Sequence, residues 1–207
     1  MIFNVEQIII SFGYTALFAI IFSETGLLLG FFLPGDTLLF SAGLLAGKGV
    51  VGLPEVIVVC FAAAVIGDSF GYYLGRRFGR GIFEKKEPHL LDDYLNKKNL
   101  EKAESLYEKY GDKIIFIARY IPVIRTIAPT LAGTAEMHYP TFLAYNVLGG
   151  LAWVLTGALA GYFIGSIIPG AMEIVSIIII LIVVLSLSPV IIKILKKKLI
   201  RQKQASL

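Results

Sequence analysis

The chain has 207 residues, of which 57% are apolar and only 16% are charged, and its mean hydropathy is +0.78. An average soluble domain carries about 25% charged residues, and a water-soluble globule of this size cannot bury so much apolar surface. These values exclude a soluble enzyme and a nucleic-acid-binding module, and they predict a polytopic membrane protein. The single cysteine, Cys60, lies in an apolar run and can form neither an internal disulfide nor a thiolate metal cluster.

The first hydrophobic block covers residues 1–75. Residues 8–22 are read as a retained span, because no basic segment precedes them and no small-residue cleavage site follows. Residues 27–47 are apolar but broken at Pro34 and Gly35, and such a break argues against a straight helix facing lipid. Residues 54–75 are long enough to cross the bilayer.

The second hydrophobic block, residues 113–192, repeats this plan. Residues 113–133 are apolar but interrupted by Pro122 and Pro129, which we predict to be breaks in a helical hairpin. Residues 141–164 and 171–192 are each long enough to span.

The charges orient these segments. Residues 76–112 carry nine Lys/Arg and eight Asp/Glu, and the tail at residues 193–207 carries six Lys/Arg and no acid. Basic residues near membrane ends favour the cytoplasm, so both segments, the first of them partly an amphipathic helix, should lie inside. With these segments inside, alternation of the four spans requires each broken segment to enter the membrane and return to the same face. The first does so from outside and the second from inside. The predicted fold is a single all-α membrane domain with four spans, two opposed re-entrant hairpins in an inverted repeat, and both termini in the cytoplasm of a bacterial inner membrane.

Glycines recur at every fourth position in the span that follows each broken segment. They are Gly67, Gly71, Gly75 and Gly79 in the first half and Gly157, Gly161 and Gly165 in the second. Small residues at this spacing let helices approach closely in lipid, and we expect that packing role here. Interrupted segments at matching places in two halves point, in transporters, to a binding site near the midplane of the membrane.

Four isolated charges belong to the broken segments or lie beside them. Glu24 and Asp36 accompany the first segment, and Arg119 and Arg125 lie in the second. A charge at mid-bilayer depth costs about 2.5–3.5 kcal/mol, so each is a candidate for function. If the hairpin tips meet, the arginines can bind a phosphate bidentately, and the acids can close the empty site or take up a coupling ion. The alternative is a pair of structural salt bridges that only rigidify the hairpins.

Other polar residues are assigned lesser roles. Asp68 and Asn146 are auxiliary candidates, for which interhelical hydrogen bonding is an alternative. His89 and His138 are far apart and have no ligand-spaced partners, so no metal site is expected. The sequence contains no phosphate loop and no nucleophile motif, and we therefore expect neither an enzyme nor a cofactor.

Several sequence blocks resemble the DedA family, the bacterial branch of the VTT-domain (SNARE-associated) membrane proteins. They are Ser23–Gly26, Phe32–Phe40, Gly67-Asp68 with Tyr72, Gly75 and Arg76, Phe116–Thr126 with Ala132-Gly133, and Tyr139–Trp153. These blocks occur in the family's order over residues 10–165, with no departure at the charged positions, whereas the last span and the tail are generic.

The resemblance implies facing re-entrant hairpins and a role in moving lipids across the membrane. It also implies that two acids and two arginines, here Glu24, Asp36, Arg119 and Arg125, are the residues on which the activity depends. Bacterial members are linked to recycling of undecaprenyl phosphate, others to phosphatidylethanolamine, and eukaryotic relatives are phospholipid scramblases.

The leading hypothesis is therefore a flippase for a lipid phosphate, with undecaprenyl phosphate as the first candidate. Arg119 and Arg125 are expected to bind the phosphate, and Glu24 and Asp36 to couple transport to protons or sodium ions. The alternatives are a phospholipid flippase or scramblase and a non-transporting structural protein. Membrane lipids are the expected partners, and nucleic acids are not expected. The sequence is compatible with a homo-oligomer.

Overall fold

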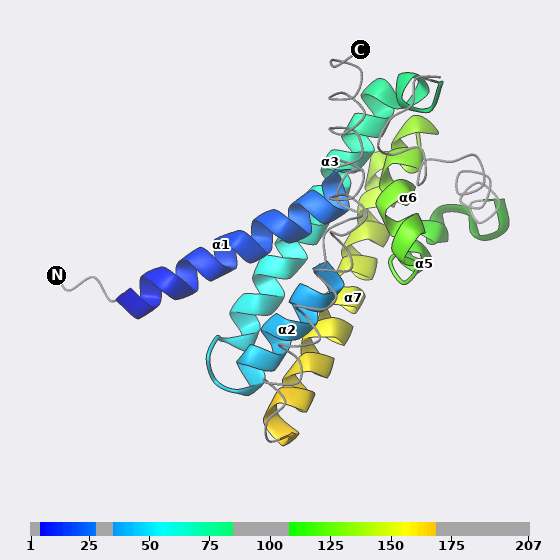
Figure 1. Ribbon diagram of the computed structural model, residues 1–207. Coiled ribbons are helices and arrows are strands. Elements are labelled where there is room, and N and C mark those ends of the chain that lie inside the picture. Colours follow the sequence, from blue (N-terminus) through cyan, green and yellow to red (C-terminus); the bar gives the residue numbers. More distant parts are fainter. Residues whose placement is uncertain (1–4, 28–34, 85–107, 169–207) are drawn as a thin grey trace, which may run out of the picture.

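The computed structural model describes residues 5–27, 35–84 and 108–168, and their regular structure is entirely helical (Figure 1). The elements are α1 (Val5–Gly26), α2 (Gly35–Gly47), α3 (Leu53–Glu84), the 3-10 turn η2 (Gly111–Lys113), α5 (Ile114–Ala118), α6 (Pro122–Thr134) and α7 (Tyr139–Ile167). No strand occurs within these ranges. The all-helical class expected from the sequence is confirmed for this part of the chain.

Two of these helices are long and apolar enough to cross a membrane, at Leu53–Phe78 in α3 and Tyr139–Ile167 in α7. A bilayer core about 30 Å thick needs about 20 helical residues. Both helices also carry large apolar side chains on their outer surfaces: Val58, Ile66 and Phe70 on α3, and Leu148, Leu151 and Phe163 on α7. Contact with lipid accounts for so many exposed apolar side chains on two long helices.

The helices begin and end differently from the predicted spans. α1 runs from Val5 to Gly26 instead of 8–22, and α3 continues to Glu84, well beyond residue 75. The extension of α3 is rich in arginine, which is a good helix former, so a change from apolar to charged residues does not end the helix. Predictions for residues 28–34, 85–107 and 169–207 lie outside the described residues. They include Pro34, most of the amphipathic segment, the last span and the basic tail.

The second broken segment forms two short helices, α5 and α6, which pack against each other. The chain turns between them at residues 119–121, and Pro122 occupies the first turn of α6, where its missing N–H costs nothing. Pro129, in contrast, lies inside α6 and does not end it. The prediction that Pro129 marks a break is wrong: the helix loses one backbone hydrogen bond there but stays helical while packed on α3.

The two halves of the chain are interleaved. The most extensive contacts between helices are those of α2 with α7 and of α3 with α6, so α2 packs on the long helix of the second half and α6 packs on the long helix of the first half. The glycine stripes form these interfaces. A Cβ on Gly75 of α3 would lie 2.0 Å from the carbonyl oxygen of Thr130 in α6, and one on Gly161 of α7 would lie 2.0 Å from that of Phe40 in α2. The packing role expected for the glycines is confirmed at Gly67, Gly75, Gly157, Gly161 and Gly165, where a Cβ would meet an atom of another helix within 2.6 Å.

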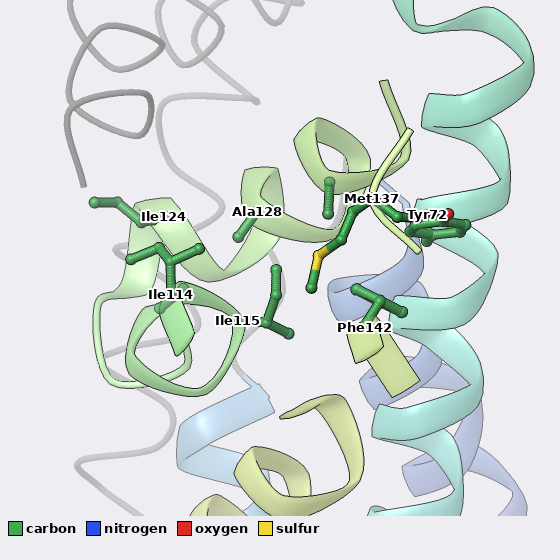
Figure 2. Packing of buried hydrophobic residues seen from close by; sticks show 9 residues of the cluster. Tyr72, Ile114, Ile115, Ile124, Ala128, Met137 and Phe142 are labelled. Atoms are coloured by element: carbon green, nitrogen blue, oxygen red, sulfur yellow. Dashed lines mark hydrogen bonds between the residues drawn. The ribbon is translucent and has the colours of Figure 1, made fainter. Parts of the chain in front are cut away.

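Two clusters of buried apolar side chains fix this arrangement. One cluster contains Tyr72 of α3 together with side chains of α5, α6 and the start of α7, including Ile115, Ala128 and Phe142 (Figure 2). The hydroxyl group of Tyr72 donates a hydrogen bond to the carbonyl oxygen of Met137. The other cluster joins α1, α2, α3 and α7 through residues such as Ile21, Leu39, Cys60, Trp153 and Val154. Glu24, Asp36 and Arg125 lie on helices, and Arg119 lies in the turn between α5 and α6.

Candidate functional site

Arg125 lies at the centre of a group of charged residues where α1, α2, α6 and α7 meet. It is in the first turn of α6, and its guanidinium group binds two carboxylates from different helices. Nη1 donates to Asp36 Oδ1 at 2.6 Å, and Nη2 donates to Glu24 Oε1. Both contacts are also salt bridges. Because the guanidinium group is planar and presents a fork of donors, one arginine can bind both acids at once.

Trp153 of α7 completes this group. Its indole Nε1 donates a hydrogen bond of 2.9 Å to Asp36 Oδ1, the same oxygen that Arg125 binds. The Trp153 ring also lies under the guanidinium group, with Cζ of Arg125 5.3 Å from the ring centroid. This is a cation–π contact. We call Glu24, Asp36, Arg125 and Trp153 the Arg125 cluster.

The two acids of the Arg125 cluster differ in their environment. The Glu24 side chain is 5% exposed, whereas that of Asp36 is 54% exposed. Asp36 is also the second residue of α2, where the positive end of the helix dipole favours a carboxylate. The cluster therefore has an inner acid that is enclosed by protein and an outer acid that is open to its surroundings.

Glu24 contacts the start of α2 directly. A Cβ at Gly35 would lie 1.4 Å from Glu24 Oε2, so residue 35 must be glycine for this approach. Oε2 is fully buried and has no hydrogen-bond partner among the residues that the structure describes. Only one oxygen of the inner carboxylate is therefore bound to Arg125, and the other is held in a tight, enclosed position.

Arg119 belongs to a second group, which we call the Arg119 cluster. It lies at the turn after α5, and its Nη2 donates to Asp68 Oδ2 of α3 and to Asn146 Oδ1 of α7, both at 2.5 Å. Asn146 in turn donates through Nδ2 to the carbonyl oxygen of Val65 at 3.1 Å. The side chains of Arg119 and Asp68 are only 4% and 6% exposed. This cluster ties α3, the α5–α6 turn and α7 together.

The structure thus brings three of the four predicted charges into one cluster and places Arg119 in the other. The two clusters are neighbours, since Asp68 also interacts electrostatically with Arg125. Asp68 and Asn146 make interhelical hydrogen bonds, which is the alternative role that the sequence allows for them. Trp153 is the member of the site that sequence reasoning missed. A signal was present, because Trp153 follows Asn146 by seven positions and therefore lies on the same helical face.

This combination of long apolar helices, short helices at the breaks and enclosed charges defines an all-helical membrane protein with a charged site inside it. A model of the VTT domain matches residues 33–163. The chain is 38% identical to protein DedA of Escherichia coli K12 over 200 residues, which cover 94% of this chain and 89% of that protein. The chain therefore belongs to the DedA family of VTT-domain membrane proteins, as its sequence motifs predicted.

Two further relatives are named as membrane proteins. The inner membrane protein YqjA of Escherichia coli K12 is 37% identical over 153 residues, covering 73% of this chain and 67% of YqjA. A membrane protein of Mycobacterium tuberculosis H37Rv is 40% identical over 150 residues, covering 72% of this chain and 64% of the relative. No solved structure matches the chain. The membrane location predicted from composition agrees with these relatives.

Proposed function

We propose that this protein is a flippase that carries a lipid phosphate, with undecaprenyl phosphate as the leading candidate, across the bacterial cytoplasmic membrane. The observation that carries this proposal is the Arg125 cluster, in which one guanidinium group is bound by an exposed and a buried carboxylate. An arginine enclosed in this way binds an anion once a carboxylate moves aside, and its fork matches phosphate oxygens as well as it matches carboxylate oxygens.

The two acids have different proposed roles. Asp36, the exposed acid, is displaced first when a lipid phosphate reaches Arg125, so that it acts as a gate. Glu24 then loses part of its compensating positive charge while it stays buried, and this favours uptake of a proton or a sodium ion. The burial of the Glu24 carboxylate, of which only Oε1 binds Arg125, supports this role. Arg119 contributes positive charge beside the phosphate and, through the Arg119 cluster, holds the second broken segment in place.

Ion coupling has an energetic reason. Moving one negative charge inward against an inside-negative membrane potential costs about 2.3 kcal/mol per 100 mV. A cation that enters with the phosphate offsets this cost. We propose that Glu24, with Asp36, carries it.

The proposed mechanism requires the full topology: four spans and two re-entrant segments that enter from opposite faces, with residues 76–112 and both termini in the cytoplasm. The interleaved packing of α2 on α7 and of α6 on α3 supports such an inverted repeat. Single cysteines at positions 27 and 47, on a background with Cys60 replaced, test the first segment. Labelling of both from the same face is expected, and labelling from opposite faces contradicts the re-entrant hairpin.

Transport is tested in vesicles that contain the full chain and undecaprenyl phosphate, with accessibility of the phosphate measured from one side. The wild-type protein should move the lipid, and Arg125→Ala should abolish movement. Glu24→Gln should retain phosphate binding but lose its dependence on the proton or sodium gradient. Full activity of Arg125→Ala would refute phosphate binding at this site. Transport that is indifferent to both gradients and to membrane potential would favour passive scrambling.

A structural role is the second candidate, and one observation favours it for part of the site. The Arg119 cluster is almost completely buried and links α3, the α5–α6 turn and α7. If Arg125→Ala and Asp36→Ala prevent folding as fully as Arg119→Ala does, the structural reading should replace transport.

A further inference from the structure

A cavity of about 320 Å³ lies between α1 and α2, and α3 contributes to its wall. Six of the residues that line it are Gly13, Leu17 and Ile20 of α1, Leu38 and Leu45 of α2, and Val56 of α3. On each of the first two helices these residues are spaced by three, four or seven positions and so share one face. We call this cavity the α1–α2 groove.

The α1–α2 groove ends about one helical turn from the Arg125 cluster. α1 and α2 touch where Glu24 Oε2 lies against Gly35, and from this contact the two helices diverge (Figure 1). Ile20 lies one turn before Glu24, and Leu38 lies one turn after Gly35. The charged site is therefore at the narrow end of an apolar wedge.

The polar groups of the groove are already bonded. At its wide end the hydroxyl of Tyr14 accepts a hydrogen bond of 3.1 Å from the backbone N–H of Gly52. In its wall the hydroxyl of Ser41 donates to the carbonyl oxygen of Thr37 at 2.5 Å. The other lining residues offer only carbon atoms from their side chains. Such a surface suits a hydrocarbon and offers little to a polar solute.

We propose that the α1–α2 groove binds one hydrocarbon chain of the same lipid whose phosphate is bound by Arg125. This inference rests on the proposed function and assigns the site for the tail. The structure places a positively charged site, Arg125, near one end of an apolar groove along α1. A lipid with an anionic head and a hydrocarbon chain fits both surfaces. From Ile20 to Gly13 the groove follows α1 for about 10 Å, at 1.5 Å per helical residue.

The groove aligns the chain and adds little affinity. A hydrocarbon chain that leaves bilayer lipid for an apolar groove removes almost no surface from water, so the hydrophobic effect contributes little. What the groove supplies is direction: a chain lying in it places the phosphate at Glu24 and Arg125. A lipid whose hydrocarbon chain fits the groove therefore presents its phosphate to Arg125, and the groove selects among lipids in this way.

The test uses hexadecyl phosphate with a photoreactive diazirine near its methyl end, added to vesicles that contain the full chain. We expect cross-linked residues at 13–17 and 45–51, identified by mass spectrometry. A second probe with the diazirine beside the phosphate should label residues 20–24 and 35–41. The corresponding fatty alcohol, which lacks the phosphate, should label the groove several-fold less. Equal labelling by the alcohol means that bulk lipid fills the groove and overturns the proposal.

A matched pair of variants tests the groove itself. Ala16 lines the groove, whereas Ala19, on the same helix, is exposed and is not among the lining residues. Ala16→Trp should reduce labelling by the tail probe several-fold, and Ala19→Trp should leave it unchanged. Equal labelling in the two variants overturns the proposal.

The two proposals fail differently. If Arg125→Ala abolishes transport but Ala16→Trp leaves tail labelling intact, phosphate binding stands and the groove assignment falls. If transport and labelling are both indifferent to Arg125→Ala, the proposed function falls, and the groove assignment falls with it.

Discussion

Trp153 and Asp36 are separated by 117 positions in the chain, and the indole Nε1 of Trp153 donates a hydrogen bond of 2.9 Å to Oδ1 of Asp36. The contact joins the second half of the chain to the outer acid of the Arg125 cluster. It holds Asp36 on the guanidinium group of Arg125, although more than half of the Asp36 side chain is exposed. Trp153 therefore acts as a latch on the acid that we propose to be the gate.

The first prediction concerns this latch. Trp153→Phe removes the hydrogen bond but keeps an aromatic ring beside Arg125. Hydrogen bonds to charged groups contribute about 1.5–3 kcal/mol, and partial exposure of Asp36 favours the lower end. Displacement of Asp36 should become easier, so the affinity for hexadecyl phosphate should rise by up to about tenfold. Trp153→Leu, which also removes the ring, is the comparison. Unchanged affinity in the Phe variant argues against a latch.

The second prediction separates stability from function at Arg125. Arg125→Gln leaves Glu24 buried without its partner, and such a loss costs about 3–5 kcal/mol. The double variant Arg125→Gln with Glu24→Gln removes both charges, so it should recover most of the thermal stability in detergent while transport stays absent. A double variant that is no more stable than Arg125→Gln would contradict the coupling between these two residues.

The third prediction compares two acids that bind different arginines. Asp68 is buried in the Arg119 cluster, whereas Asp36 is exposed. Asp68→Asn should lower the stability by about 3 kcal/mol or more, because Arg119 keeps a buried charge without its counter-charge. Asp36→Asn should change it by less than about 1 kcal/mol, because exposed ion pairs contribute little, yet it should alter transport. Thermal unfolding and transport measured on both variants check this. Equal destabilisation would mean that Asp36 has a structural role.

The fourth prediction tests the interleaved packing. Gly75→Ala and Gly161→Ala each place a Cβ 2.0 Å from a backbone oxygen of a neighbouring helix. The helices must move apart, and overpacking of this kind costs about 1–3 kcal/mol or more. A Cβ at Gly13 meets nothing within 4 Å, so Gly13→Ala is the control. It should be neutral or stabilising, since alanine is a better helix former by about 1 kcal/mol. The apparent melting temperatures of the three variants in detergent give the comparison.

The sequence by itself determined the class of this protein. The chain has an excess of apolar residues, and its charges are concentrated in two segments. Composition alone gives the amount of apolar surface that must be kept from water, and this amount is too large for a soluble globule. The family motifs and the isolated charges Glu24, Asp36, Arg119 and Arg125 could also be read directly, since a charge in an apolar block is conspicuous wherever the helices lie. The fourfold glycine spacing predicted close helix packing, and that prediction is confirmed.

Only the tertiary structure decided which charges are partners. Arg119, in the turn after α5, binds Asp68 and Asn146. Arg125, in α6, binds Glu24 and Asp36. These pairings cannot be predicted from local sequence, because they depend on which helices pack against each other. The same holds for Trp153, an ordinary aromatic residue in sequence, which becomes part of the site because α7 packs on α2. Pro129 stays helical because α6 packs on α3, an interaction that local propensity cannot express. Composition and spacing fix what each segment can be, and packing between distant segments fixes what each side chain touches.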